Sequence, residues 1–175
     1  MQGLGLLIVQ RGFKIVRISV SPETRAQESV KYLTADNPFP EFETVDDLDD
    51  AYAPGPYLKR ITMDQFAEQG GNVYDDSLWK DYPHEQSEAI VGRMRKAFDE
   101  MAESIKIGES GILLSHGDPI SWLLNDVIKG SLPKPKDLRN SLYPEKGVAS
   151  VLVLDSSNKL INHYKLNPQG AGSKY

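Results

Sequence analysis

A histidine stands at the end of an apolar run in the segment "GILLSHGDPISWLLNDVIKG". The run is typical of a buried strand, and Gly117 follows His116 where the backbone can approach a ligand closely. Asp118 and Pro119 fit the N-cap and the first position of the amphipathic helix that comes next. A histidine here can simply be a partly buried polar group. It can also bind a charged group or transfer a proton, which makes His116 a candidate site residue.

A second strand-to-helix junction places an arginine at the start of a helix. In "KIVRISVSPETRAQ", an alternating strand pattern is followed by Ser21 and Pro22, which fit an N-cap and a first helical position. Arg25 then falls in the first turn. Helix N-termini favour anions, and a guanidinium adds a two-pronged donor that matches phosphate oxygens. The two junctions therefore predict an anion site if they lie side by side.

The elements that must position these residues alternate between helix and strand, without an internal repeat. Because ligands collect at the carboxyl ends of strands in α/β sheets, this order fits a site at both junctions. The pattern predicts an α/β fold with a mostly parallel sheet. Helices are expected before Gly12, over 21–33 and 85–107, and from 119; strands are expected over 13–20, 41–45, 111–115, 148–155 and 160–166.

Two parts of the chain lack such periodicity. Residues 46–83 are rich in Asp, Pro, Gly and Tyr, and they are expected to form an irregular insertion over the site. The last residues, 169–175, are expected to be a disordered tail. We therefore expect one domain over residues 1–168.

Composition narrows the classes of function. The chain has 175 residues, of which 39% are hydrophobic and 26% charged, as in a single globular domain. A net charge of −5 argues against a general nucleic-acid binder, and the absence of cysteine excludes disulfides and thiolate chemistry. The apolar stretch "LGLLIV" is too short to span a bilayer and lacks the flanks of a signal peptide. We expect a soluble, cytoplasmic protein with no membrane partner.

Three segments together resemble the histidine phosphatase superfamily, the phosphoglycerate-mutase-like proteins. Members carry a Ser-Pro-x-x-Arg-Ala segment after their second strand, matched by "SPETRA" at 21–26, and a later Ser-His-Gly segment, matched at 115–117. The ending "GVASVLVLDSSNKLINHYKL" is similar to the closing strands of the family. The resemblance covers nearly the whole chain, is weakest across 46–83, and implies a three-layer α/β sandwich.

The resemblance also implies roles for individual residues. Family enzymes transfer a phosphoryl group through a phosphohistidine and need no metal or other cofactor. By resemblance, His116 and Gly117 would contact the phosphoryl oxygens and Arg25 would clamp them. The family often places its proton donor in a Leu-x-Glu segment, where "DDLDD" offers Asp50, with Asp49 beside it. Aspartate is shorter than the glutamate of the family.

One part of the family pattern has no match in the sequence. The nucleophilic histidine lies in an Arg-His-Gly segment, which does not occur here, and "IVQRGF" lies too close to Ser21 to replace it. The resemblance matches "MQGLGLLIVQRGFK" to a later helix, so the first strand is expected to be missing from this chain. We expect "KIVRISV" and "GILLS" to face the resulting gap. Three outcomes are open: the two strands close directly on each other, another segment or chain fills the slot, or the product is unstable. Expressed alone, the chain is expected to be poorly soluble, oligomeric or less stable.

Several functions remain open at this point. One is phosphomonoester hydrolysis or phosphoryl transfer in an intact parent, with this chain inactive by itself. Another is a non-catalytic module that binds a phosphorylated small molecule or a phosphoprotein. An α/β-hydrolase is disfavoured because no Gly-x-Ser-x-Gly segment occurs. A metal site at His84 is disfavoured because its "HEQSE" segment lacks the second histidine of a zincin motif. A homo-oligomer is compatible with each function.

Overall fold

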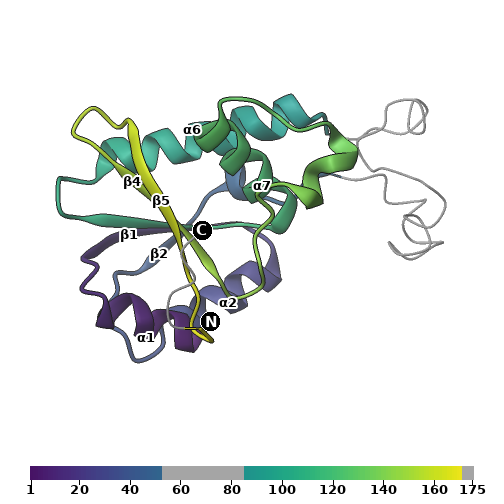
Figure 1. Ribbon diagram of the computed structural model, residues 1–175. Helices are drawn as coiled ribbons and strands as arrows, with labels where there is room; N and C mark the ends of the chain where they lie inside the picture. Colours follow the sequence, from purple (N-terminus) through teal and green to yellow (C-terminus); the bar gives the residue numbers. More distant parts are fainter. Residues whose placement is uncertain (53–84, 171–175) are drawn as a thin grey trace.

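The computed structural model describes residues 1–52 and 85–170, and it places a parallel sheet between two layers of helices (Figure 1). The sheet has the strand order β2-β1-β3, and β1 pairs in parallel with both neighbours. The α/β fold with a parallel sheet is therefore confirmed. The strands are β1 (Ile15–Val20), β2 (Phe42–Thr44) and β3 (Ser110–Leu114).

Helices cover both faces of this sheet (Figure 1). On one face, Ile18 and Val20 of β1 pack against Ala26 and Val30 of α2, and α1 lies beside α2. On the other face, α6 and α7 enclose a core that includes the fully buried Trp122. Alternate residues of each strand serve opposite faces. The helices are α1 (Gln2–Gln10), α2 (Thr24–Thr34), α6 (Ser87–Ser104) and α7 (Gly117–Leu124).

The last two strands form a separate antiparallel sheet. β4 (Ala149–Leu154) pairs with β5 (Leu160–Leu166) through a turn in which Asn158 adopts a left-handed φ of 60°. Among the described residues, β3 is therefore an edge strand of the parallel sheet. Shorter helical turns complete the described chain: η1 (Asp46–Leu48), the π-helical η2 (Asn125–Lys129) and η3 (Pro135–Asn140).

Of the three outcomes left open for "KIVRISV" and "GILLS", the structure shows direct closure of β1 on β3. The two strands pair directly, with Ser19 opposite Leu113 and Val20 opposite Leu114. Direct closure leaves no gap between these two segments, because their backbone N–H and C=O groups satisfy one another in a parallel ladder.

Both helices that carry the candidate residues begin at positions other than those predicted. α2 begins at Thr24, with Glu23 at the N-cap position, because the Ser21 hydroxyl is buried and accepts the Glu23 N–H. α7 begins at Gly117, with His116 at the N-cap position, so Asp118 lies in the first turn and is not the N-cap. Arg25 remains in the first turn of its helix, as predicted.

Candidate functional site

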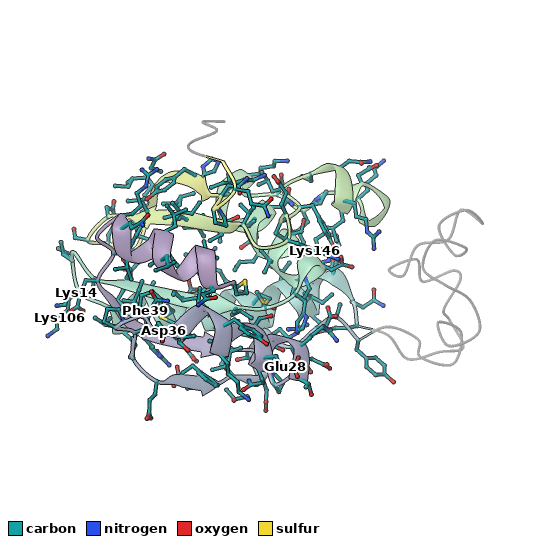
Figure 2. The ribbon with its side chains drawn as sticks, turned by 90° about the horizontal axis from the view of Figure 1, so that it is seen from below. Lys14, Glu28, Asp36, Phe39, Lys106 and Lys146 are labelled. Carbon is teal, nitrogen blue, oxygen red and sulfur yellow. The ribbon has the colours of Figure 1, made fainter. Side chains whose placement is uncertain are left out.

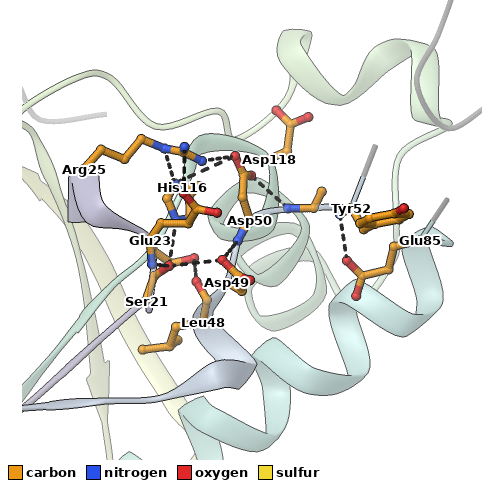
Figure 3. A network of polar contacts seen from close by, with 12 residues as sticks. Ser21, Glu23, Arg25, Leu48, Asp49, Asp50, Tyr52, Glu85, His116 and Asp118 are labelled. Atoms are coloured by element: carbon orange, nitrogen blue, oxygen red, sulfur yellow. Dashed lines mark hydrogen bonds and ion pairs between the residues drawn. The ribbon is translucent and has the colours of Figure 1, made fainter. Parts of the chain in front are cut away.

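The carboxyl ends of all three parallel strands meet at one edge of the sheet. The N–H of Ser21 donates to the carbonyl of Leu114 at 2.9 Å, and the N–H of Val45 donates to the carbonyl of Val20 at 2.9 Å. These two bonds align the segments that follow β1, β2 and β3. As a result, residues 21–25, 45–50 and 115–118 come together (Figure 3).

His116 is buried at the centre of this edge, with 9% of its surface exposed. Its Nδ1 accepts a hydrogen bond from Nε of Arg25 at 3.1 Å, and its Nε2 lies 2.8 Å from the hydroxyl of Ser21. Since arginine only donates, Nδ1 carries the lone pair, and the neutral ring carries its proton on Nε2. The structure thus brings His116 and Arg25 together although they lie 91 residues apart in sequence.

The surroundings of His116 favour this neutral form. Burial lowers the pKa of His116 below its ordinary value, and the positive charge of Arg25 lowers it further. The carboxylates of Asp50, Asp49 and Glu23 act in the opposite direction on the same pKa. The net shift is downward, so His116 is uncharged in the structure at neutral pH.

Asp50 joins the same cluster through Arg25. Its Oδ2 accepts from Nη2 of Arg25 at 2.5 Å and lies 3.8 Å from Nδ1 of His116. Arg25 also donates from Nη1 to Glu23 at 3.1 Å. The Arg25 and Asp50 side chains are 57% and 40% exposed, so this side of the cluster is open to a ligand.

Two residues to which the sequence analysis gave no catalytic role, Ser21 and Asp49, contact the other members of the cluster. Ser21 is fully buried, contacts His116, and donates from its hydroxyl to Oδ1 of Asp49 at 3.4 Å. Asp49 in turn accepts the N–H of Asp50 at 2.8 Å. The sequence signals for Ser21 were its place directly after a predicted strand and its place in the "SPETRA" segment, and the expected N-cap role accounted for the residue without any contact to His116.

Arg93 of α6 holds the turn that presents Asp49 and Asp50. Its Nη1 donates to the carbonyls of Asp47 and Asp49, both at 2.8 Å, and its Nη2 donates to the carbonyl of Asp50 at 3.2 Å. Arg93 also forms an ion pair with Glu85, in which its Nε donates to Oε1 of Glu85 at 2.7 Å. The two side chains are 16% and 19% exposed. The main chain at Asp50 is therefore anchored to the helix layer, and no sequence pattern indicated this.

Gly117 lies against an aromatic ring. A Cβ at this position would approach the hydroxyl of Tyr143 to 2.4 Å, so the side chain of Tyr143 fills the space that the glycine leaves. The same hydroxyl donates to Asp118 at 2.6 Å. Burial, followed by this bond to Asp118, raises the pKa of Tyr143 above its ordinary value. Contact of Gly117 with phosphate remains a prediction.

The other histidines do not join this cluster in the described part of the chain. His163 is exposed on β5, whereas His84 and most of the predicted insertion lie outside the described residues. Within residues 1–52 and 85–170, no three His, Cys, Asp or Glu side chains are arranged to hold a metal ion. No helix in those same ranges has the length and apolarity needed to cross a bilayer.

Comparison with known families identifies one match that spans most of the chain. The family model of the histidine phosphatase superfamily (branch 1) matches residues 5–165. This range includes both strand-to-helix junctions and the whole cluster around His116. A search of curated proteins finds no match to the sequence.

Solved structures with a similar fold include three phosphatases. The α-ribazole phosphatase from Shigella flexneri has a TM-score of 0.67 at 18% identity, covering 99% of this chain and 83% of its own. A mycobacterial glucosyl-3-phosphoglycerate phosphatase has a TM-score of 0.61 at 12% identity, with coverages of 94% and 82%. The protein histidine phosphatase SixA, complexed with tungstate, has a TM-score of 0.57 at 15% identity, with coverages of 96% and 78%. The TM-scores show that the fold is shared, and at identities this low the comparison shows the fold alone.

Proposed function

We propose that this chain, which belongs to the histidine phosphatase superfamily, is a phosphatase-type domain that binds the phosphoryl group of a phosphorylated small molecule or a phosphoprotein. The observation that carries the proposal is the contact between Arg25 and His116 at the carboxyl ends of β1 and β3. Both residues lie at helix N-termini, where unpaired backbone N–H groups add to the attraction for an anion.

In this proposal each residue of the chain acts on a different part of the phosphoryl group. Arg25 clamps the equatorial oxygens. His116, whose Nδ1 faces Arg25, donates a hydrogen bond to them from Nδ1 once this nitrogen is protonated and has released the Arg25 N–H. Both contacts stabilise the charge that spreads over these oxygens during transfer. Asp50 lies close enough to Arg25 to protonate a leaving oxygen bound in the same place. Gly117 offers its backbone beside His116.

A specific observation favours a second candidate, a non-catalytic module that binds a phosphorylated ligand. The sequence contains no Arg-His-Gly segment, and its three histidines are His84, His116 and His163. His116 contacts Arg25 and Ser21, which suits a group that stabilises the phosphoryl oxygens rather than one that attacks phosphorus. In this alternative the cluster around His116 binds a phosphorylated ligand without hydrolysing it.

Hydrolysis and binding assays separate the two candidates. For this chain we expect negligible turnover of p-nitrophenyl phosphate, because a covalent phosphoenzyme requires the missing nucleophile. We expect Arg25→Ala to weaken binding of inorganic phosphate or tungstate by about 1.5–3 kcal/mol, as for a lost charge-assisted bond, whereas Arg95→Ala on the exposed face of α6 leaves it unchanged. Robust hydrolysis that His116→Ala abolishes would refute the inactive assignment. Equal anion affinity in wild type and Arg25→Ala would remove Arg25 from the site.

A further inference from the structure

The guanidinium of Arg25 has a partner at each of its three nitrogen atoms. Nε donates to His116 at 3.1 Å, Nη1 donates to Glu23 at 3.1 Å, and Nη2 donates to Asp50 at 2.5 Å (Figure 3). A phosphate clamp uses two neighbouring N–H groups of the planar fork, and both such edges of a guanidinium include Nη2. Nη2 carries one N–H on each edge, so the carboxylate of Asp50 occupies one of the positions at which a two-pronged phosphate contact forms.

The position of that carboxylate matches the position of a phosphate oxygen. Oδ2 of Asp50 contacts Arg25 and lies 3.8 Å from Nδ1 of His116, so it stands beside both groups that are proposed to bind the ligand. A carboxylate oxygen and a phosphate oxygen are the same kind of acceptor for arginine. We infer that Asp50 is an internal occupant of the phosphate position and that a phosphorylated ligand binds by displacing its carboxylate from Arg25.

The main chain at Asp50 is held by Arg93, whereas its carboxylate is held by contacts that a ligand can replace. Arg93 holds the carbonyls on both sides of this position, at Asp49 and Asp50, so the turn itself stays in place. The carboxylate is held by Arg25 through one oxygen and by the N–H of Ala51, at 2.8 Å, through the other. Its side chain is 40% exposed, so a rotation about its own bonds moves the carboxylate into solvent without disturbing the sheet.

The charge around the site makes this displacement selective. Three carboxylates, from Glu23, Asp49 and Asp50, surround the single charge of Arg25 and a neutral His116. An anion that only replaces Asp50 gains little, because it exchanges one charged contact for another. A phosphate ester whose remaining atoms make further contacts gains more. Asp50 is thus a specificity-determining residue that disfavours free inorganic phosphate, an inference that rests on the proposed function.

The test compares anion binding in variants that lose one negative charge at different places. Isothermal titration calorimetry measures the Kd of inorganic phosphate, and then of tungstate, for the wild type, Asp50→Asn and Asp99→Asn. Asp99 is an exposed aspartate on α6 paired with Arg95, so its variant controls for net charge. We expect Asp50→Asn to lower the Kd about tenfold, from the removal of one like charge at contact distance, and Asp99→Asn to change it less than about twofold. The double variant Arg25→Ala/Asp50→Asn should lose the gain.

Each outcome bears on a different statement. If Asp50→Asn binds phosphate no more tightly than the wild type, while Arg25→Ala still weakens binding, the inference about Asp50 is overturned and the proposed anion site stands. If wild type and Asp50→Asn both fail to bind phosphate and tungstate, the inference and the anion site fall together. Circular dichroism confirms that each variant is folded. Asp50→Ser, which keeps an acceptor near Ala51, provides a second uncharged variant with the same expected gain.

Discussion

The two ends of strands β1 and β3 hold charged side chains in different ways. At the amino end, the N–H of Ser110 donates to the carbonyl of Lys14 at 2.8 Å, and Lys14 pairs with Glu109 at 2.9 Å. The lysine side chain is 68% exposed, and Figure 2 shows Lys14 and Lys106 together at this end of the molecule. The Glu109 side chain is 17% exposed, and the exposed ammonium of Lys14 leaves the pair open to screening by solvent.

At the carboxyl end, the charged groups share partners around a buried ring. Arg25 donates hydrogen bonds to His116, Glu23 and Asp50. His116 also contacts the buried Ser21. The strands are the same and ion pairs occur at both ends. What distinguishes the candidate site is therefore the convergence of three segments on a buried titratable group, and not the presence of charge.

The largest effect that tests this comparison is expected for Arg93, which anchors the turn at the carboxyl end. Arg93→Ala removes donors from three backbone carbonyls and leaves the half-buried Glu85 without its cation. We expect a loss of about 3 kcal/mol in the free energy of unfolding, as for breaking a buried ion pair. Urea denaturation followed by circular dichroism measures it. A loss no larger than that of Arg95→Ala, on the exposed side of the same helix, would show that the turn is not held in this way.

A smaller effect is expected from the buried histidine. The pKa of His116 is lowered in the folded state, so protons bind more readily to the unfolded chain as pH falls below about 6.5. Its contribution to stability is complete above that pH and is lost as pH falls toward the lowered pKa. Melting temperatures measured between about pH 7.5 and 5 should therefore decline, and His116→Gln should reduce the slope.

The matched variant for this pH dependence is His163→Gln. His163 is exposed on β5, away from the cluster, and its removal should leave the decline with pH intact. If His163→Gln flattens the profile as much as His116→Gln does, burial at the carboxyl end is not the source of the pH dependence.

The smallest effect is expected at the amino end. Lys14→Ala removes the exposed partner of Glu109, and we expect no measurable change in the melting temperature, because the pair is screened by solvent. The same variant should leave phosphate binding unchanged, since Lys14 lies at the end of β1 opposite to the candidate site. A destabilisation as large as that of Arg93→Ala would abolish the distinction between the two ends.

Much of the candidate site could be predicted because its main residues carry local signals. His116 and Arg25 each follow a strand and begin a helix, and the residue types alone indicate anion chemistry. Asp50 could be singled out only by resemblance. Arg93 could not be predicted, since its neighbours on α6 give it no distinguishing pattern and its partners are backbone carbonyls of another segment. Tyr143 was missed for the same reason: its contact with Gly117 comes from an irregular span.

The sequence by itself determined the order of the helices and strands. Apolar periodicity, and the turns and helix ends formed at Pro and Gly, depend on only a few neighbouring residues. The sequence also determined which strand ends carry the candidate residues His116 and Arg25. Only the tertiary structure decided that β1 and β3 pair directly, and that Ser21 contacts His116 rather than capping α2. Both outcomes depend on hydrogen bonds between segments far apart in the chain, where strand register, rather than local propensity, selects the partners.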